Sequence, residues 1–458
     1  MNNRTLLFFL SFLSIVTVLI ASQSISATCF LLFTLAVGFI VILSTCENKD
    51  YKFVVNVFLL SFVVIAIETL LQWLGIEANM ASFADDDNDQ FKFWTESLRG
   101  VSVSSPEVLF KECIRDNVYY ENGGYYFYIQ LIAYISSHYF DGNHLLTQMY
   151  GSSVFGMLSS VFIFHILRKY LTTDKACKYA LIYVLLTPVL PDCIMIHRDP
   201  VISFLYLVLI YLWLCRKFTP VNFIMQAAII LILINLRLQH GLFAITFLVL
   251  SIFSLQNSLK WVYVGSMIAL IIVYGISFAD YIFMTATDTF LYYDNFTNEQ
   301  LDGLNTGLGR FVYTLPTPVK EIAQIFFLQL QFPSWGALQK STNIYQFIIG
   351  THSFVICVFW FYVFSFSVVA MLKYKFKNLP ALLKYGLIVF LSFLLLNTSA
   401  LEVRRVVCVY PILYLVYIYY HNMLASKLFI HNVKRTYALV YVALCLVYFS
   451  ASVIIGGL

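Results

Sequence analysis

Long apolar runs, separated by short polar stretches, make up most of this chain. A membrane-spanning helix needs about 20 apolar residues in a row, and about 13 runs approach that length. They lie near residues 5–22, 27–45, 53–73, 148–167, 179–196, 200–215, 221–236, 241–257, 260–279, 344–372, 381–400, 406–421 and 436–455. The pattern predicts an all-α polytopic membrane protein with about 13 transmembrane helices. The first run also fits a signal peptide, but the second run follows almost at once, which favours a helical hairpin.

One further run, residues 125–139, is short and aromatic, and charge decides whether it should cross. If it crossed, the basic linker after the next span would share a side with the acidic loop 85–89, against the tendency of Lys and Arg to stay in the cytoplasm. If it lies at the interface, most basic residues face the cytoplasm with only three acids, Glu47, Asp50 and Asp174. We therefore expect residues 125–139 to stay outside the membrane core.

This topology places the N-terminus in the cytoplasm and the C-terminus outside. Two long segments, about 74–147 and 280–343, then lie on the outer side, where we expect juxtamembrane helices. No fixed-period repeat and no low-complexity linker divides the chain. The sequence therefore predicts a single transmembrane domain over residues 1–458.

Composition and charge narrow the classes of function. Hydrophobic residues make up 60% of the chain and charged residues 11%, so lipid is the main solvent and membrane lipid is a partner. The net charge of +4 is spread in ones and twos, which leaves no basic stripe for a nucleic acid to follow. The nine cysteines show neither CxxC nor Cys/His ligand spacing, so no disulfide framework and no zinc site is predicted.

Four carboxylates lie close together at the start of the first outer segment: Asp85, Asp86, Asp87 and Asp89. Clustered carboxylates repel one another unless a proton, a cation or an arginine shares the site. One of the first three is a candidate general base, and Asp86 and Asp89 could hold a divalent metal. A solvated acidic loop at the membrane surface explains the pattern equally well.

Arginine recurs in three of the outer helix turns, although Lys and Arg are disfavoured on that face. Charges at membrane depth usually face a cavity or a partner, and the planar guanidinium group suits phosphate. The arginines predict an outer cavity that binds an anion such as the phosphate of a lipid carrier. The alternative is that an arginine and an aspartate in the same turn pair only with each other and bind no ligand. The three turns contain His197, Arg198 and Asp199; Arg237 and His240; and Glu402, Arg404 and Arg405.

The second outer segment adds two basic residues, Arg310 and Lys320, before an apolar and aromatic stretch at residues 325–335. An amphipathic helix that lies on the surface and guides a lipid substrate fits this pattern. Plain anchoring at the interface fits it as well.

The order of these features resembles that of GT-C fold glycosyltransferases, which use polyprenyl-phosphate-linked sugars. In that family an acidic motif follows an early span, and amphipathic juxtamembrane helices come next. The matching stretches here are Asp85-Asp86-Asp87, then Asn122-Gly123-Gly124-Tyr125-Tyr126-Phe127-Tyr128, Asp141-Gly142-Asn143 and Leu167-Arg168-Lys169-Tyr170-Leu171. The acidic motif departs from the family pattern by following the third span, and no Trp-Trp-Asp motif of the oligosaccharyltransferases is present.

Two later features also look like bacterial surface-polysaccharide enzymes. These often have an Arg-Asp turn after a span with proline, as at Arg198-Asp199 after Pro188, and an arginine before a late proline, as at Arg405 before Pro411. The low-charge composition, rich in Phe, Tyr and Ile, is similar to that of O-antigen polymerases.

The resemblance implies an inverting glycosyl transfer at the periplasmic face of a bacterial inner membrane. One of Asp85, Asp86 or Asp87 would be the general base, and Arg198, Arg237 and Arg405 would hold the phosphate that leaves the polyprenyl-linked donor. The acceptor would be a glycan or a second lipid-linked saccharide. No cofactor is implied with certainty, and a single-sugar transferase is not separated from a repeat-unit polymerase.

A lipid-linked sugar flippase or secondary transporter is the alternative. Such proteins also need many spans and charges in a cavity, but they more often show repeated halves and charges near mid-membrane. In this sequence Glu68 is the only clear ionisable residue in the middle of a predicted span, and the polar residues gather on one face of the membrane.

Overall fold

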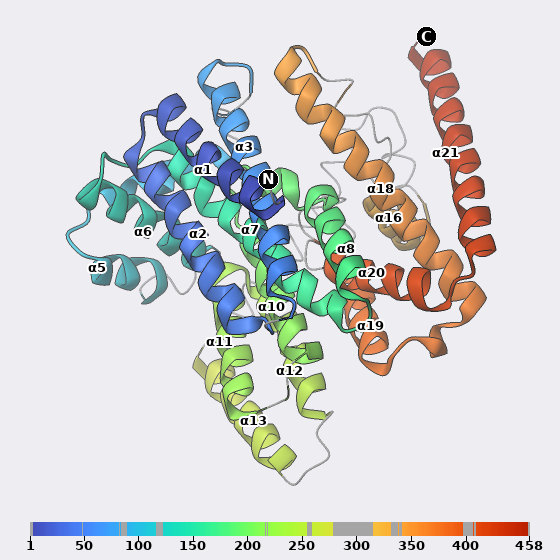
Figure 1. Ribbon diagram of the computed structural model, residues 1–458. Helices are drawn as coiled ribbons and strands as arrows, with labels where there is room; N and C mark the ends of the chain where they lie inside the picture. Colours follow the sequence, from blue (N-terminus) through green and yellow to red (C-terminus); the bar gives the residue numbers. More distant parts are fainter. Residues whose placement is uncertain are drawn as a thin grey trace.

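The computed structural model describes residues 3–456 apart from 48, 82, 84–88, 116–121, 216, 218, 254–258, 278–314, 331–337, 339, 340, 397–405, 407 and 408. The described residues form helices and no strand (Figure 1). Among them, five helices are long and apolar enough to cross a membrane. These are α1 (Asn3–Ser22), α2 (Ile25–Thr45), α3 (Tyr51–Glu77), α7 (Leu145–Arg168) and α18 (Ile344–Tyr374). The expectation of an all-α protein of membrane type is confirmed.

Shorter apolar helices follow other predicted runs. At 1.5 Å per residue, 16 or 17 residues extend about 25 Å, less than the roughly 30 Å of a bilayer core. These helices are α10 (Asp199–Cys215), α11 (Pro220–Leu236), α12 (Leu238–Phe253) and α19 (Ala381–Leu396). Three more helices coincide with predicted runs: α13 (Leu259–Ser277), α20 (Val409–Tyr419) and α21 (Lys427–Gly456). The total of about 13 crossings stays a prediction.

One predicted span is broken. The run 179–196 predicts a continuous helix, but the structure has α8 (Thr173–Leu186) followed by a single turn, α9 (Leu190–Cys193). Pro188 has no amide hydrogen and disfavours helical backbone at the residue before it. Thr187 accordingly has a ψ of 140°. The prediction of one continuous helix was wrong because these local effects end α8.

Side chains of α18 bind the carbonyl groups that the end of α8 leaves open. His352 Nε2 lies 3.0 Å from the carbonyl oxygen of Leu185, and Trp360 Nε1 donates to the carbonyl oxygen of Leu186. The last carbonyl groups of a helix have no partner within the helix, and lipid offers none. The early end of α8 is therefore stabilised by α18.

Helix α6 (Gly123–Tyr139) lies across one side of the bundle. At its start, a Cβ added to Gly124 would lie 3.1 Å from the backbone of Asn235, near the end of α11. Beyond its other end, the Asp141 carboxylate accepts hydrogen bonds of 2.7 Å from the N–H groups of Ile25 and Ser26, at the start of α2. The start of α2 and the end of α11 lie on the same side, because Ser26 contacts Thr147 at the start of α7, and Arg237, after α11, contacts Asp199 at the start of α10. Helix α6 thus runs between two points on one side of the bundle, as the prediction of an interfacial helix requires.

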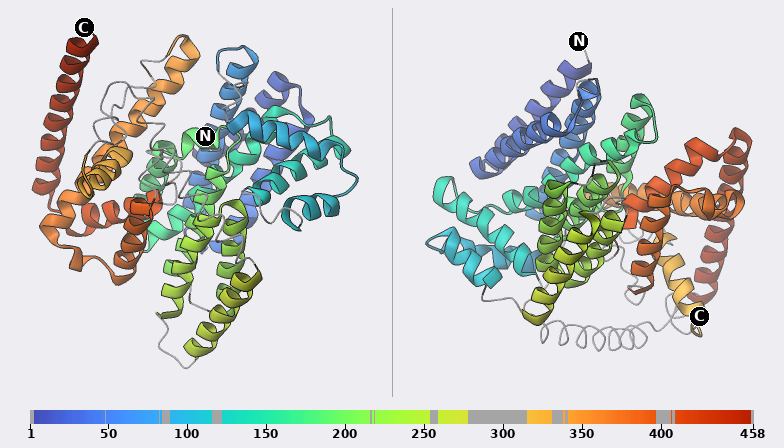
Figure 2. Two further views of the ribbon diagram at one scale, coloured as in Figure 1. Left: turned by 180° about the vertical axis from the view of Figure 1, so that it is seen from behind. Right: turned by 90° about the horizontal axis from the view of Figure 1, so that it is seen from below.

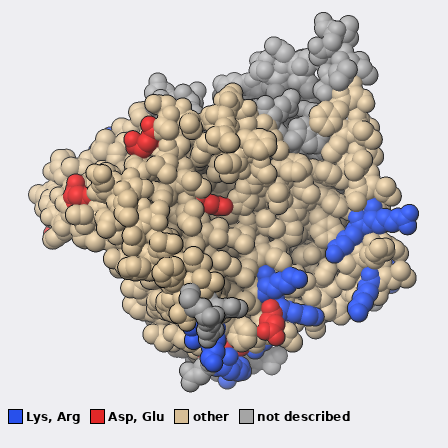
Figure 3. Space-filling model, turned by 45° about the horizontal axis from the view of Figure 1, so that its top comes forward, with Lys and Arg blue, Asp and Glu red and all other residues tan. Residues whose placement is uncertain are grey.

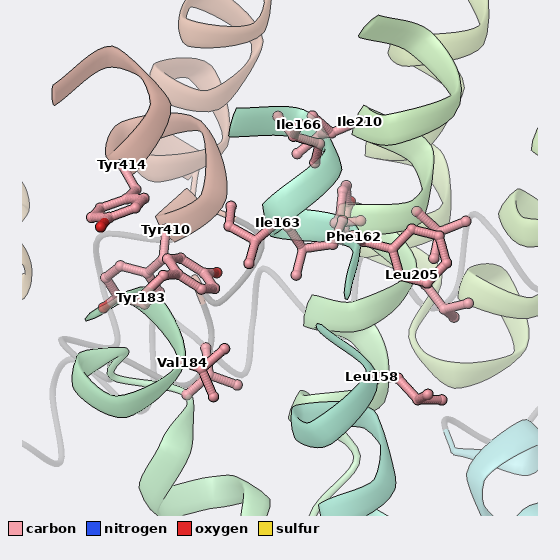
Figure 4. Close-up of a cluster of buried hydrophobic side chains, with 14 of the residues drawn as sticks. Leu158, Phe162, Ile163, Ile166, Tyr183, Val184, Leu205, Ile210, Tyr410 and Tyr414 are labelled. Atoms are coloured by element: carbon pink, nitrogen blue, oxygen red, sulfur yellow. The ribbon is translucent and has the colours of Figure 1, made fainter. Parts of the chain in front are cut away.

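A continuous hydrophobic core joins the N-terminal and C-terminal helices. Figure 4 shows side chains of α7, α8, α10 and α20 meeting there. The ring of Tyr183 in α8 lies 5.2 Å from that of Tyr414 in α20, and the ring of Tyr410 lies 4.8 Å from that of Trp360 in α18. In a membrane such packing stabilises through van der Waals contact, because lipid tails are as apolar as the core. Figure 2 shows the C-terminal helices as a group beside the rest.

Charged residues mark the two ends of the bundle. We call the end where α2 finishes and α3 begins the basic side, because it carries Lys49, Lys52, Arg168, Lys169 and Lys175. Figure 3 shows Lys and Arg gathered along one edge of the face in view. The opposite side is where α3 ends and where α7 and α18 begin.

Candidate functional site

Residues 194–199, which run from the end of α9 to the first residue of α10, form what we call the charged turn, and α7 holds it in place. Ser152 Oγ donates to the carbonyl oxygen of His197 (3.1 Å) and accepts from the His197 N–H (3.2 Å). The Ser152 hydroxyl lies 3.1 Å from the hydroxyl of Tyr125 in α6. Because a serine hydroxyl has one hydrogen, Tyr125 must be the donor in that pair. The non-helical backbone thus finds its partners inside the protein, as it must at membrane depth.

The charged turn is recessed below the opposite side of the bundle. Ser153 Oγ donates to the carbonyl oxygen of Cys193 (2.8 Å) and lies 2.7 Å from Thr69 Oγ1. Ser153 is eight residues from the start of α7, and Thr69 is eight residues from the end of α3. At 1.5 Å per residue, both helices continue about 12 Å past the turn. The short lengths of α10, α11 and α12 agree with this depth.

A tight helical hairpin brings Arg237 to the charged turn. Arg237 is the single residue between α11 and α12. Gly241 permits so close an approach, because a Cβ at this position would lie 2.6 Å from the backbone of Ile234. The hydroxyl of Tyr206 in α10 donates to the carbonyl oxygen of His240 (2.8 Å). This bond ties α12 to α10, and α10 begins at the charged turn.

The two turns form a buried cluster of charges. Arg237 Nη1 lies 4.0 Å from Asp199 Oδ1, and the charges of Arg198 and Arg237 both act on the Asp199 carboxylate and on the His240 ring. The exposed fractions are 5% for Asp199, 9% for Arg237 and 1% for His240. Buried charges are expensive unless they are paired and hydrogen-bonded. Such a cluster is therefore a candidate for function.

The pairing within the cluster is incomplete. The 4.0 Å between Arg237 and Asp199 exceeds a direct hydrogen bond, and a bridging oxygen would fit between them. Arg237 Nε and His240 Nδ1 are buried and make no hydrogen bond to any part of the chain that the structure describes. An unpaired buried polar atom costs about 1–3 kcal/mol. Asp199 Oδ1 is also buried without a hydrogen-bond partner among the described residues, so a bound anion with several oxygens would satisfy the two nitrogen atoms but not this carboxylate.

A polar contact between His197 and Asp192 also supports the charged turn. His197 Nδ1 lies 3.0 Å from Asp192 Oδ1 in α9, and the two side chains are 10% and 16% exposed. This contact connects α9, which contains Asp192, with the charged turn, which contains His197. The carboxylate of Asp192 also acts electrostatically on Asp199.

A further polar pair lies at the same depth, between α3 and α18. His352 Nδ1 is 3.1 Å from Glu68 Oε1, and His352 Nε2 is 3.0 Å from the carbonyl oxygen of Leu185. A carbonyl only accepts hydrogen bonds, so Nε2 must carry hydrogen. The Glu68–His352 contact then needs one shared proton, either on Nδ1 or on the carboxyl group. His352 is eight residues from the start of α18, about 12 Å along the helix.

The structure brings together five of the residues that sequence predicted for the site: His197, Arg198, Asp199, Arg237 and His240. Lys320 lies in α16 (Val319–Leu330), which packs against α18 and α19. Outside the described residues lie Asp85, Asp86, Asp87, Arg310, Glu402, Arg404 and Arg405.

Asp89 begins α4 (Asp89–Ser97), which packs against α6. The ring of Phe93 in α4 lies 4.8 Å from that of Tyr125, and Tyr125 contacts the serine that holds the charged turn. A short chain of contacts therefore joins the acidic segment to the cluster. Within the described ranges, no three His, Cys, Asp or Glu side chains gather as a metal site, and Asp86 lies outside them.

Sequence reasoning missed three participants: Asp192, Tyr125 and His352. Asp192 follows a proline in an apolar run, which is itself an anomaly that could have drawn attention. Tyr125 lies in a run of similar residues, so nothing local distinguishes it, whereas His352 is a histidine inside an apolar predicted span and could have drawn attention as Asp192 could.

Comparison with known protein families, with curated proteins and with solved structures finds no match for this chain.

Proposed function

We propose that the protein transfers glycosyl groups at the charged turn, from a polyprenyl-(di)phosphate-linked sugar or oligosaccharide, at the periplasmic face of a bacterial inner membrane. The transfer would serve the assembly of O-antigen or another surface polysaccharide. The observation that carries the proposal is the contact between Arg237 and Asp199, which come from two separate turns and are both buried, with Arg198 next to Asp199 in the chain. The sequence resemblance to GT-C glycosyltransferases is the second support.

The charge of the cluster suits this chemistry. The acceptor hydroxyl oxygen would attack the anomeric carbon while the bond from that carbon to the phosphate oxygen breaks, with inversion. Negative charge grows on the leaving phosphate, so Arg198 and Arg237 would stabilise the transition state more than the bound substrate. One of Asp85, Asp86 or Asp87 would take the proton of the acceptor. The recessed position would let the polyprenyl chain remain in lipid.

Transport of a lipid-linked sugar is a second candidate, and two observations favour it. Transporter sites often lie near mid-membrane between interrupted helices, and here α8 ends early and the charged turn lies about 12 Å along α7. The pair of Glu68 and His352 also places ionisable groups within long helices, which is typical of proton-coupled pathways. Release of the polyprenyl phosphate carrier from the donor distinguishes the two functions, because only glycosyl transfer breaks the bond between the sugar and the phosphate.

Purified protein in nanodiscs, supplied with polyprenyl-diphosphate-linked donor and acceptor, tests the proposal. We expect release of the polyprenyl carrier, and about a 100-fold lower rate for Arg237→Gln and Arg198→Gln, the usual effect of removing one group that stabilises transition-state charge. The rate of Arg237→Lys should lie between those of the natural chain and Arg237→Gln, because lysine keeps the positive charge but lacks the planar guanidinium group. Arg99→Gln, an exposed arginine of the first outer segment, is the matched control.

Glycan profiles of a deletion strain separate the two kinds of transfer. Loss of chain length indicates a polymerase, and loss of one branch sugar indicates a single-sugar transferase. An unchanged glycan, or full activity in both Arg→Gln variants with normal thermal unfolding, would rule the proposal out.

A further inference from the structure

A hollow of about 460 Å³ opens on the basic side, between the ends of α2, α3, α7 and α10. Its lining includes Lys49, Asp50, His165, Arg168, Lys169 and Tyr211. Arg168 is the last residue of α7, whereas Ser153, which binds the carbonyl group of Cys193 just before the charged turn, is 15 residues earlier in the same helix. The hollow therefore lies about 22 Å from the candidate site along α7, and nothing in the proposed reaction uses it.

Two cations of the hollow are fixed by hydrogen bonds and still have donors to offer. Arg168 Nε donates to Asp50 (2.9 Å), and Arg168 Nη1 donates to the carbonyl oxygen of Leu171 (2.8 Å). A guanidinium group has five N–H donors, so these bonds use two of them. Lys169 Nζ donates to the carbonyl oxygen of Leu214, at the end of α10, which uses one of its three donors. Both cations are held in position without being saturated.

The third cation is positioned to move toward a ligand. Lys49 Nζ lies 2.6 Å from Glu47, but the two side chains are 67% and 74% exposed. Exposed ion pairs contribute little to stability, so Lys49 can exchange Glu47 for a stronger anion. Asp50 also attracts Lys49 electrostatically, but its carboxylate is already bound by Arg168 and Thr173.

The inner wall of the hollow is aromatic. The rings of His165 and Tyr211 lie 5.8 Å apart, and His165 Nε2 is 3.1 Å from Thr45 Oγ1. The volume of the hollow falls within the usual range for small-ligand sites, about 300–1,000 Å³. Cations at the rim and rings at the wall suit a ligand with a phosphate at one end and an apolar part at the other.

We propose that this hollow binds the phosphate-bearing headgroup of an anionic phospholipid on the basic side of the membrane. The hollow lies where the helices end, which is the level of lipid headgroups. Basic pockets between transmembrane helices on the cytoplasmic side are a common place for anionic lipids. The lipid phosphate would contact Arg168, Lys169 and Lys49, and its glycerol part would lie against His165 and Tyr211.

Binding of defined lipids to the full chain, purified in a neutral detergent, tests this site by native mass spectrometry. We expect phosphatidylglycerol to bind and phosphatidylcholine, whose phosphate is neutralised by choline, to bind at least tenfold more weakly. The double variant Lys49→Gln, Lys169→Gln should bind phosphatidylglycerol about tenfold more weakly than the natural chain. The double variant Lys175→Gln, Lys178→Gln is the matched control, since both of these lysines are exposed on the same side and outside the hollow.

Three outcomes would overturn the proposal: equal binding of the two lipids, equal losses in the two double variants, or tighter binding of inorganic phosphate than of phosphatidylglycerol. The last outcome would show a site for a soluble anion. If the Lys169→Gln change prevents folding, Lys49→Gln alone suffices, because its exposed side chain is not needed for packing. That single variant should still bind phosphatidylglycerol more weakly than Lys178→Gln does.

Discussion

Asp141 shows how a single side chain joins distant helices in this protein. Its carboxylate accepts hydrogen bonds from the N–H groups of Ile25 and Ser26, at the start of α2, where a helix has no internal partners for its first N–H groups. Ser26 Oγ in turn donates to the carbonyl oxygen of Gly142. Burial raises the pKa of Asp141, but the hydrogen bonds from Ser26 and Ile25 outweigh it, so the pKa lies below its ordinary value.

Replacing Asp141 with alanine should lower the free energy of unfolding by about 1 kcal/mol, the typical effect of losing a helix cap. A carboxyl group whose pKa is lowered by folding stabilises the protein above its unfolded-state pKa, and this contribution is lost as the pH falls through the folded-state pKa. The difference between the natural chain and the variant should therefore be constant near neutral pH and shrink below about pH 4. Thermal unfolding in detergent across pH measures it.

The matched control is Glu77→Ala, which removes an exposed acid at the end of α3. If Asp141→Ala unfolds at the same temperature as Glu77→Ala, the cap does not stabilise the fold.

At the scale of elements, polar side chains connect α18 to the helices of the N-terminal half. Tyr345 donates to Gln72 of α3, and two turns further along α18, His352 contacts Glu68. Trp360 donates to the carbonyl oxygen of Leu186, at the end of α8. These three residues lie on one face of α18. The helix therefore positions the early end of α8, and with it the non-helical segment before α9 and the charged turn.

A double-mutant cycle on Glu68 and His352 should show a coupling of about 1–2 kcal/mol in unfolding free energy. Each single change to alanine leaves the other polar group without its partner at membrane depth, so either one should destabilise the protein nearly as much as both together. The cycle on Glu96 and Arg99, a pair at 3.2 Å whose arginine is exposed, should give only about 0.3 kcal/mol. Equal couplings in the two cycles would contradict a structural role for the Glu68 pair.

On the scale of the whole molecule, the sorting of charge and the placement of α6 predict one topology. The basic side should face the cytoplasm, and both ends of α6 should be outside. In a chain whose nine native cysteines are replaced, single cysteines at Glu107 and Tyr139, exposed positions on either side of α6, should react with an impermeant maleimide added to intact cells.

A cysteine at Lys178, which is exposed on the basic side, should react only after the cells are opened. If Tyr139 reacts only after the cells are opened and Lys178 reacts in intact cells, α6 crosses the membrane, and the orientation of every later helix has to be reversed.

Local sequence was enough to locate most helices, because a bilayer demands long apolar runs whatever the rest of the fold does. The run 344–372 became α18 (Ile344–Tyr374), and the run 148–167 became α7 (Leu145–Arg168). The prediction that residues 179–196 form one helix was wrong, because hydropathy does not take into account how Pro188 restricts the backbone.

Part of the candidate site also followed from sequence, since Arg198 and Arg237 stand out wherever charge is rare. Only the tertiary structure decided that these two arginines converge, that the charged turn is recessed, and that Glu68 pairs with His352. The physical reason is that hydropathy is a property of neighbours in the chain, whereas ion pairs and buried hydrogen bonds join residues far apart in it. Their partners are set by how the helices pack.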